Sequence, residues 1–308
     1  MQVFVVGSFV VACSVLVARL PRAGESLDAA DFVVEPGGKG FNLAVVAHRL
    51  GAHVDGAFAI GDDPFSDIAR SAFQRAGLSA DMLVHRTGST GAGVGFVDGD
   101  GENCLAVSLG ANRLLCAKDI ARVAHVVDGA ALVMATFESP DAPILAAFTR
   151  ARARGATTLL NPSPSRPIDP RILAATSILI VNRVEGCDLG LDEAIASGAG
   201  ATPSIERLLE AGPELVVVTL GEAGALAFRE GAPPIHQKAA KVTVIDTIGA
   251  GDGFAGSLGV GLLQGLTLEE ALRRAAACGA LTTTRFGAFD AFPTAAELDA
   301  FLATGHRA

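Results

Sequence analysis

Short runs rich in Val, Ile and Leu alternate along the chain with longer Ala-rich stretches of helical period. This alternation is typical of strand–helix units around a mainly parallel sheet, and it predicts an α/β fold. The expected strands are Val3–Val6, Val54–Ile60, Ala131–Ala135, Thr157–Asn161, Ile178–Val181, Leu215–Thr219 and Lys241–Ile245. The expected helices are Phe41–Leu50, Phe65–Ala76, Pro140–Arg154, Ser204–Glu210, Asp252–Leu263, Leu268–Thr283 and Ala295–Leu302.

Two extended segments interrupt this pattern, at Val10–Val34 and at Gly91–Leu109. Both carry strand-forming residues with no helix between them, and the second contains the turn Asp98-Gly99-Asp100-Gly101. They predict hairpins that form a small second sheet over a site. Because no repeat or linker marks a boundary, we expect one domain over residues 1–308.

The composition narrows the range of partners. The 308-residue chain has a formal net charge of −9 and a pI near 5.1. Such an acidic chain lacks the basic surface that binding to nucleic acid or to an anionic membrane needs, so a phosphate site must be built locally. Its cysteines, at positions 13, 104, 116, 187 and 278, include no CxxC pair, which indicates neither a disulfide framework nor a zinc site and fits a reduced cytoplasm.

The N-terminal segment from Val3 to Ala18 carries no charge and has two interpretations. It resembles the apolar part of a signal peptide, but no Lys or Arg precedes it and Gly7-Ser8 interrupts it. Its many Val residues favour two successive strands.

The strongest chemical motif is the run Asp246-Thr247-Ile248-Gly249-Ala250-Gly251-Asp252, which leads into an Ala- and Gly-rich helix. Its small residues let the backbone N–H groups of 249 to 251 converge at the positive end of a helix dipole, and this predicts an anion hole. Asp252 has two interpretations: it caps the helix, or it accepts a proton from a substrate hydroxyl while the N–H groups stabilise a transferring phosphoryl group.

A competing motif overlaps this run, because Gly251-Asp252-Gly253-Phe254-Ala255-Gly256 satisfies the GxGxxG pattern of dinucleotide-binding proteins. In that pattern the first glycine directly follows a strand, whereas these glycines lie within the expected helix. A nicotinamide oxidoreductase is therefore the less favoured alternative. The sequence contains neither GxxxxGK[ST] nor the signature motifs of protein kinases.

A second glycine motif lies at the start of the first expected helix, at Gly37-Gly38-Lys39-Gly40-Phe41-Asn42. Glycines permit close approach of the backbone to a ligand, and Lys39 and Asn42 can hydrogen-bond hydroxyl groups. A plain glycine turn beside a solvated lysine is the alternative.

Together these residues resemble the ribokinase-like (PfkB) family of carbohydrate kinases. The resemblance runs nearly end to end, and the two glycine motifs match the family's two signatures. The other matching segments are Gly61-Asp62-Asp63, Gly99-Asp100-Gly101-Glu102-Asn103, Glu138-Ser139-Pro140, Asn161-Pro162-Ser163-Pro164, Asn182-Arg183-Val184-Glu185 and Thr219-Leu220-Gly221-Glu222-Ala223-Gly224.

The resemblance implies a three-layer α/β/α Rossmann-like fold, with a β-lid built from about 10–34 and 91–109, and an ATP-dependent kinase of a sugar-like molecule. Asp252 would be the catalytic base, and Gly249, Ala250 and Gly251 would form the anion hole. Gly38, Lys39, Gly40, Asn42 and Glu138 would hold the substrate. Asn182, Thr219, Gly221, Gly224 and Gly251 would bind ATP, and Glu185 would hold Mg²⁺ through water.

The resemblance also implies K⁺ and a second subunit. Asp246, Ile248, Arg285 and Gly287 match a monovalent-cation site of the family, although Ala291 stands where the family has a serine. The β-lid implies a homodimer.

The sequence departs from the family at the sugar end. Family members carry Asn and Asp shortly after the Gly-Ser pair, where this chain has Val10 and Ala12. Ribose hydroxyls would face an apolar wall there. We therefore expect a deoxygenated or otherwise modified sugar, or a nucleoside, with ribose bound more weakly through Lys39, Asn42 and Glu138 as the alternative. A non-catalytic sugar or nucleotide sensor is a further alternative.

Overall fold

The computed structural model describes residues 1–98, 103–191, 195 and 202–304. Its main sheet has nine strands in the order β13-β12-β11-β10-β9-β8-β1-β4-β5. The strands pair in parallel from β11 to β5, and β12 and β13 pair antiparallel at one edge. The strands are β1 (Gln2–Gly7), β4 (His53–Ile60), β5 (Leu83–His85), β8 (Leu132–Thr136), β9 (Thr157–Asn161), β10 (Ile178–Asn182), β11 (Leu215–Thr219), β12 (Ala225–Phe228) and β13 (Ile235–Gln237).

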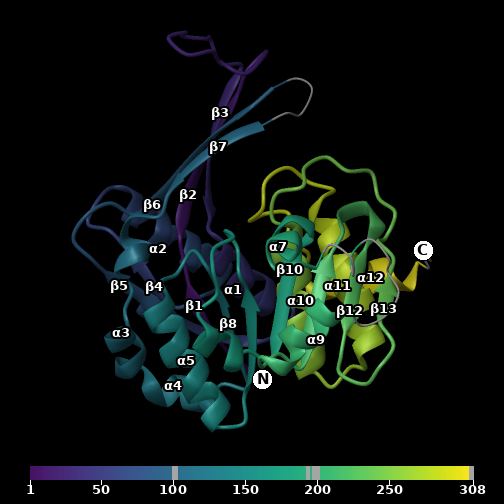
Figure 1. The fold of residues 1–308 in the computed structure, drawn as a ribbon. Helices are drawn as coiled ribbons and strands as arrows, with labels where there is room; N and C mark the ends of the chain where they lie inside the picture. The colour runs from purple at the N-terminus through teal and green to yellow at the C-terminus, as the bar shows by residue number, and fades with distance from the viewer. Residues whose placement is uncertain (99–102, 192–194, 196–201, 305–308) are drawn as a thin grey trace.

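Helices cover both faces of this sheet (Figure 1). The core beneath one face includes residues of α1 (Lys39–Arg49), α2 (Phe65–Ala76), α10 (Ala250–Leu263), α11 (Leu268–Thr282) and α12 (Ala295–Ala303). The core beneath the other face includes residues of α3 (Ala117–Arg122), α4 (Ala124–Gly129), α5 (Asp141–Ala153), α6 (Pro170–Ala174) and α9 (Pro203–Glu210). Short elements complete the chain: α7 (Arg183–Asp188), η1 (Ala80–Met82), η2 (Gly110–Leu114) and η3 (Gly221–Ala223).

Strand β1 shows why the sequence forms three layers. Its side chains alternate between the two faces, so Val3 and Val5 enter one core while Phe4 and Val6 enter the other. All four are fully buried, as the continuous apolar run of a two-sided parallel strand requires. The predicted α/β/α fold is confirmed.

The predicted strands and helices match the observed ones with small shifts of their ends, with one exception. Lys241–Ile245 is not a strand. It runs beside the C-terminal end of α11, where the Ile245 N–H donates to the Thr283 carbonyl at 2.8 Å, and Val244 and Ile245 are exposed. The Val-rich pattern predicted a strand, but this segment pairs with no described strand.

A second sheet rises from the body of the protein in the order β3-β2-β6-β7 (Figure 1). Its strands are β2 (Val10–Leu16), β3 (Asp31–Gly37), β6 (Gly91–Val97) and β7 (Asn103–Ser108). The two outer pairs are antiparallel, as the predicted hairpins require, but β2 and β6 pair in parallel. Residues 99–101 of the predicted turn Asp98-Gly99-Asp100-Gly101 lie outside the described residues.

The uncharged N-terminal segment forms strands on both sides of Gly7-Ser8, namely β1 in the main sheet and β2 in the second sheet. Gly7 itself leaves room for the Phe58 ring, which a Cβ would meet at 1.9 Å. Among the described residues, the structure contains no helix with the length and apolarity that crossing a membrane requires.

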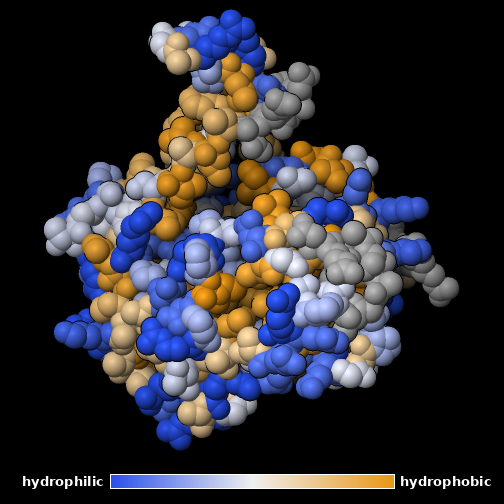
Figure 2. Space-filling view, in the orientation of Figure 1, coloured by the Kyte–Doolittle hydropathy of each residue, from blue (hydrophilic) through white to orange (hydrophobic). Residues whose placement is uncertain are grey.

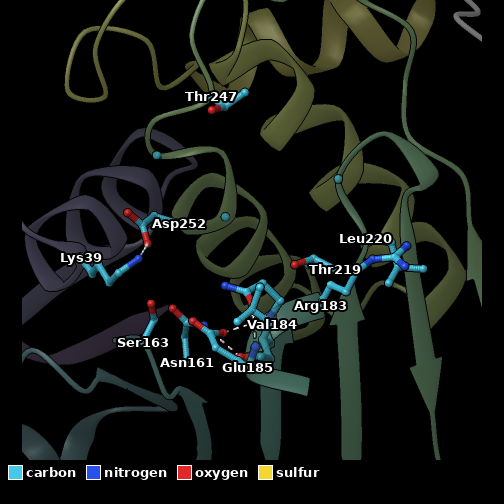
Figure 3. A pocket seen from close by; sticks show the side chains of 15 residues that line it. Lys39, Asn161, Ser163, Arg183, Val184, Glu185, Thr219, Leu220, Thr247 and Asp252 are labelled. Atoms are coloured by element: carbon cyan, nitrogen blue, oxygen red, sulfur yellow. Dashed lines mark hydrogen bonds and ion pairs between the residues drawn. The ribbon is translucent and has the colours of Figure 1, made fainter. Parts of the chain in front are cut away.

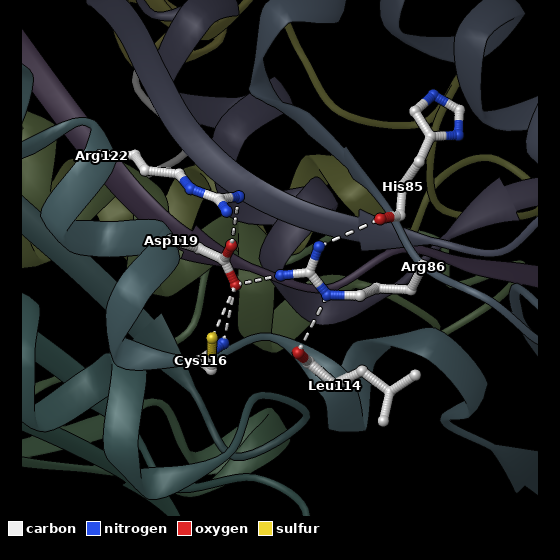
Figure 4. A network of polar contacts seen from close by, with 6 residues as sticks. All are labelled: His85, Arg86, Leu114, Cys116, Asp119 and Arg122. Atoms are coloured by element: carbon white, nitrogen blue, oxygen red, sulfur yellow. Dashed lines mark hydrogen bonds and ion pairs between the residues drawn. The ribbon is translucent and has the colours of Figure 1, made fainter.

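A buried polar network joins the end of β5 to the start of α3 (Figure 4). The Asp119 side chain is 2% exposed and accepts hydrogen bonds from Arg86, from the Cys116 N–H and from the Cys116 thiol. Burial raises the pKa of Asp119, but these bonds outweigh it and hold the pKa below its ordinary value. The ionised carboxylate therefore stabilises the fold, and this contribution is lost as the pH falls through the lowered pKa.

We expect Asp119→Ala to lower the free energy of unfolding by about 3 kcal/mol, because the Arg86 guanidinium and two Cys116 donors would lose their hydrogen-bond acceptor. Arg122 also pairs with Asp119, but its side chain is 73% exposed, so Arg122→Ala should change the free energy by less than about 1 kcal/mol. Urea unfolding of both variants measures the difference. Equal losses would contradict the importance of the buried bonds.

Candidate active site

A cavity of about 490 Å³ opens at the carboxyl ends of the parallel strands, where ligands of open α/β sheets bind (Figure 3). Asn161, Asn182 and Thr219 end β9, β10 and β11 and contribute to its wall. The full lining is Lys39, Asn161, Ser163, Ile180, Asn182, Arg183, Val184, Glu185, Thr219, Leu220, Gly221, Thr247, Gly249, Gly251 and Asp252. The cavity therefore brings Lys39, the one residue of the Gly37–Asn42 motif on its wall, together with the start of α10 and the strand-end segments.

The start of α10 forms one end of the cavity. Gly249 precedes the helix with φ 78°, a left-handed conformation that glycine adopts without strain. A Cβ added to Gly251 would meet no atom within 4 Å, so the backbone here is open to the cavity. Among the predicted N–H donors, that of Ala250 is directed to the Thr247 carbonyl at 3.3 Å. The predicted anion hole thus has Gly249 and Gly251, but not Ala250, on the cavity wall.

Asp252 lies in the first turn of α10 and is only 5% exposed. Its Oδ2 accepts a hydrogen bond from Asn42 Nδ2 at 2.7 Å, and Lys39 Nζ lies 4.0 Å from its Oδ1. Burial raises the pKa of the Asp252 carboxyl, although Lys39 and Asn42 oppose this shift. The pKa of Lys39 is raised in turn, chiefly by Asp252. A buried carboxylate faces a cation at the cavity wall, which is an arrangement suited to proton transfer.

The glycine motif at the start of α1 is held against the end of β1 by Glu138 and Ser8. Glu138 Oε2 accepts hydrogen bonds from Ser8 Oγ at 2.6 Å and from the Lys39 N–H at 2.7 Å, while the Gly40 N–H donates to Ser8 Oγ at 3.0 Å. Burial raises the pKa of the Glu138 carboxyl. A Cβ on Gly40 would lie 2.3 Å from the Ser8 nitrogen, so glycine is required by close backbone approach.

Val10 and Ala12 begin β2, beside this glycine motif. Val10 is paired with Gly37 and Gly91, and a Cβ on Gly38 would lie 2.9 Å from the Val10 nitrogen. Ala12 faces Glu35 across the strand pair. The two apolar substitutions predicted to alter the sugar end therefore adjoin the residues predicted to hold the substrate.

Asn182 and Glu185 cap α7 reciprocally. Asn182 Oδ1 accepts from the Glu185 N–H and Glu185 Oε2 accepts from the Asn182 N–H, both at 2.9 Å. These bonds fix both side chains at the cavity wall, and among the described residues no other hydrogen bond uses Glu185 Oε1 or the Asn182 NH₂ group, so both are available to a ligand. Carboxylate oxygen is a suitable donor for Mg²⁺ or for its water shell, so the pair fits that ion.

The segment after β11 is only partly at the cavity. Thr219 and Gly221 line it as predicted, with Leu220 between them. Gly224 does not line it; its φ of 92° and the 2.0 Å distance from an added Cβ to the Gln237 carbonyl oxygen mark a tight turn into β12.

The predicted cation residues lie together on two adjoining loops. Asp246 joins these loops, since its carboxylate accepts hydrogen bonds from the Ile248 and Gly287 N–H groups, both at 3.0 Å. The Arg285 side chain does not join these loops; it donates a hydrogen bond to Glu297 Oε1 at 2.7 Å. A cation here would use backbone carbonyl groups, and neither Asp246 nor Ile248 uses its carbonyl in the backbone bonds of the described residues. The loops fit a monovalent cation on this ground.

Several lining residues had no predicted role. The sequence places Asn161 and Ser163 in a segment that matches the family, and Arg183 and Thr247 inside two of its motifs, but it predicts no role for any of the four. Ser8 was seen only as a break in an apolar run, although it anchors Glu138. A role for Asn161 could have been predicted, because it is a polar residue at the end of a buried strand. Ser8 stands in no such pattern, so nothing in the sequence indicated its role.

The GxGxxG pattern has a structural explanation. Gly253 and Gly256 lie inside α10, where a Cβ on Gly253 would lie 2.8 Å from Thr282 Oγ1 and one on Gly256 would lie 2.8 Å from Val46 Cγ1. These glycines permit close packing on α11 and α1, so the dinucleotide interpretation has no support in the fold.

Comparison with known proteins agrees with this geometry. Residues 1–295 match the pfkB family of carbohydrate kinases. Mouse ribokinase is 32% identical over 301 residues, covering 96% of this chain and 93% of that protein. The deoxyribokinase of Salmonella typhimurium is 28% identical over 310 residues, covering 98% and 99%. A solved structure of Arabidopsis thaliana ribokinase, complexed with ribose and ATP, is similar with a TM-score of 0.84 and 26% identity, covering 98% of each chain.

Proposed function

The chain belongs to the pfkB family of carbohydrate kinases, and from this premise we propose how its residues carry out phosphoryl transfer. It is an ATP-dependent sugar kinase of the ribokinase type, a phosphotransferase with an alcohol group as acceptor. The observation that carries our proposal is the buried Asp252 carboxylate at the wall of the cavity, held by Asn42 and facing Lys39.

In the proposed mechanism Asp252 accepts the proton of the acceptor hydroxyl. The hydroxyl oxygen attacks the γ-phosphorus of ATP in line, the bond to the β-phosphate oxygen breaks, and ADP leaves with that electron pair. Burial raises the pKa of Asp252, which makes its carboxylate a stronger base. The N–H groups of Gly249 and Gly251 at the start of α10 stabilise the transferring group; Ala250 takes part through backbone shape alone.

The substrate is held by Gly38, Lys39, Gly40, Asn42 and Glu138. Asn42 Oδ1 supports this proposal, because it is buried and accepts no hydrogen bond in the described part of the chain. A hydroxyl donor of the substrate would satisfy it. Glu138 acts mainly by fixing the glycine motif through Ser8 and the Lys39 N–H.

The nucleotide occupies the other end of the cavity, between Asn182, Thr219 and Gly221, with Gly251 beside its terminal phosphate. Gly224 contributes by shaping the turn. Glu185 would hold Mg²⁺ through water, and the bound ion would neutralise charge on the phosphates. The loops that carry Asp246, Ile248, Arg285 and Gly287 would hold K⁺, which would brace the start of α10. Omission of Mg²⁺ should abolish ADP release, and replacement of K⁺ by Na⁺ at equal ionic strength should reduce it; no response to either ion would refute its assignment.

The second sheet supports a homodimer. Hydrophobic surface, coloured orange in Figure 2, lies along this projecting sheet. Two of its large apolar side chains are exposed, Phe32 by 59% and Leu105 by 65%. Phe32, Val34 and Val94 lie on one face of the sheet and are also exposed, so a second copy of the sheet would bury them. A monomer mass by light scattering would exclude this state. In the described part of the chain Cys13, Cys104, Cys116 and Cys278 are free thiols, which fits a cytoplasmic enzyme; fractionation of the source cells would test this location.

For the substrate we propose a sugar that presents an apolar face to Val10 and Ala12, such as a deoxypentose, with a nucleoside as the second candidate. The deoxyribokinase similarity supports the first choice. We expect kcat/KM for 2-deoxyribose to exceed that for ribose by about tenfold, because an unpaired buried hydroxyl costs roughly that factor. An ADP-release assay over pentoses, hexoses, ketodeoxy acids and nucleosides measures it.

The variant Val10→Asn with Ala12→Asp should shift the preference toward ribose. Ser14→Asp is the matched control, since Ser14 shares the strand and face with Ala12 but lies farther from the glycine motif. Ribose giving by far the highest kcat/KM in the unaltered enzyme would overturn the substrate proposal and leave the kinase assignment intact.

A further inference from the structure

Four ionisable side chains line the cavity: Lys39, Arg183, Glu185 and Asp252. Their formal charges sum to zero, so the cavity has no net positive charge to attract a polyanion such as ATP. The net charge of the whole protein, −9, also repels ATP. The distribution of the charges along the cavity therefore decides which group meets the phosphates.

Lys39 and Arg183 differ in their surroundings. Lys39 lies 4.0 Å from the Asp252 carboxylate, so its charge is largely balanced. Arg183 is exposed, and within residues 1–98, 103–191, 195 and 202–304 it takes part in no ion pair. Figure 3 shows it extending toward Thr219 and Leu220, away from Lys39 and Asp252.

The position of Arg183 along the chain is unfavourable for the free protein. It is the first residue of α7, directly after the capping residue Asn182. The positive end of the helix dipole lies there, so a cation is disfavoured. An anion held between Arg183 and the Thr219–Gly221 segment would remove this disadvantage, and a planar guanidinium suits the geometry of phosphate oxygens.

We infer that Arg183 binds the diphosphate part of the nucleotide, at the end of the cavity opposite Asp252. This inference rests on the proposed function and adds a residue to it. Arg183 is then a nucleotide-binding residue that contacts ADP as well as ATP, whereas Lys39 lies beside Asp252 at the substrate end of the cavity.

The test compares Arg183→Ala with the unaltered enzyme by calorimetric titration with ADP plus Mg²⁺ and, separately, with adenosine. We expect the Kd for ADP to rise about tenfold, as for loss of one charge-assisted hydrogen bond, and the Kd for adenosine to stay within about twofold. Arg183→Lys should give an intermediate Kd for ADP, because it keeps the charge and loses the planar fork.

The melting temperature separates binding from structural support. Because Arg183 opposes the helix dipole, Arg183→Ala without nucleotide should melt at the same temperature or higher, and its upward shift with ADP should shrink. The control is Arg171→Ala, an exposed arginine at the start of α6 outside this cavity, which should leave the Kd for ADP unchanged.

Two results would overturn the inference while the kinase assignment stands. One is an unchanged Kd for ADP in Arg183→Ala, and the other is an equal loss of ADP and adenosine affinity, which would mean that the guanidinium contacts the base or ribose. If the unaltered enzyme bound neither ligand, the proposed function itself would fail.

Discussion

Asp252→Asn should reduce kcat for phosphoryl transfer by about 10³-fold or more, while the affinity for ATP changes little. The amide cannot accept the proton of the substrate hydroxyl, but it has nearly the same shape and can still accept the hydrogen bond from Asn42. Because burial raises the pKa of Asp252, the ionised carboxylate costs folding free energy at neutral pH, and the amide removes that cost. The melting temperature should therefore not fall.

Asp67→Asn is the matched control for this variant. Asp67 also occupies the first turn of a helix, α2, but its side chain is 76% exposed and is remote from the cavity. If Asp252 served only the helix start, its replacement would lower stability and leave activity close to normal, as for Asp67. Substantial residual kcat in a well-folded Asp252→Asn enzyme would exclude it as the base.

Gly251→Ala should separate stability from activity. Gly251 lies in the first turn of α10, its φ is not positive, and an added Cβ would meet no protein atom within 4 Å. Alanine in a helix is favoured over glycine by about 0.5–1 kcal/mol, so the variant should unfold at slightly higher urea. The new methyl group would stand in the cavity where the phosphoryl group approaches, and kcat/KM should fall by about 10²-fold.

Gly256→Ala gives the opposite pattern in the same helix. Its Cβ would lie 2.8 Å from Val46 Cγ1, inside the contact with α1 and away from the cavity. This variant should lose stability and keep the kcat of its folded fraction. Urea unfolding and steady-state kinetics of the two variants test the pair; a Gly251→Ala enzyme with full activity would show that this face of α10 does not meet the phosphoryl group.

The sequence was sufficient to predict the layers of the fold because the signals were strong. Buried parallel strands read as continuous apolar runs, and the helices Phe65–Ala76 and Leu268–Thr282 have long amphipathic or Ala-rich periods. Elements such as α6 and β13 span only 5 and 3 residues, so no periodicity could reveal them. The strand prediction for Lys241–Ile245 was wrong because composition indicates strand propensity but not the presence of a partner strand.

In the candidate site, too, residues of a continuous motif were predicted and residues defined by distant contacts were not. Gly249, Gly251 and Asp252 stand in one continuous run, and the structure brings them to one wall. Ser8 was missed because its importance lies in two contacts, with Glu138 and the Gly40 N–H, that join distant parts of the chain. Arg183 was passed over because its significance depends on which neighbouring charges are already balanced, and only the folded cavity shows that.

The order of the chain has a consequence for synthesis on the ribosome. All nine strands of the main sheet lie between Gln2 and Gln237, and α10 begins only at Ala250. A nascent chain can therefore complete this sheet before Asp252, the proposed base, has been made. The hydrogen bond between Asn42 and Asp252, which spans 210 residues, then joins an early helix to a late one. Incomplete chains that end before Asp252 would carry the main-sheet framework without the ability to consume ATP productively.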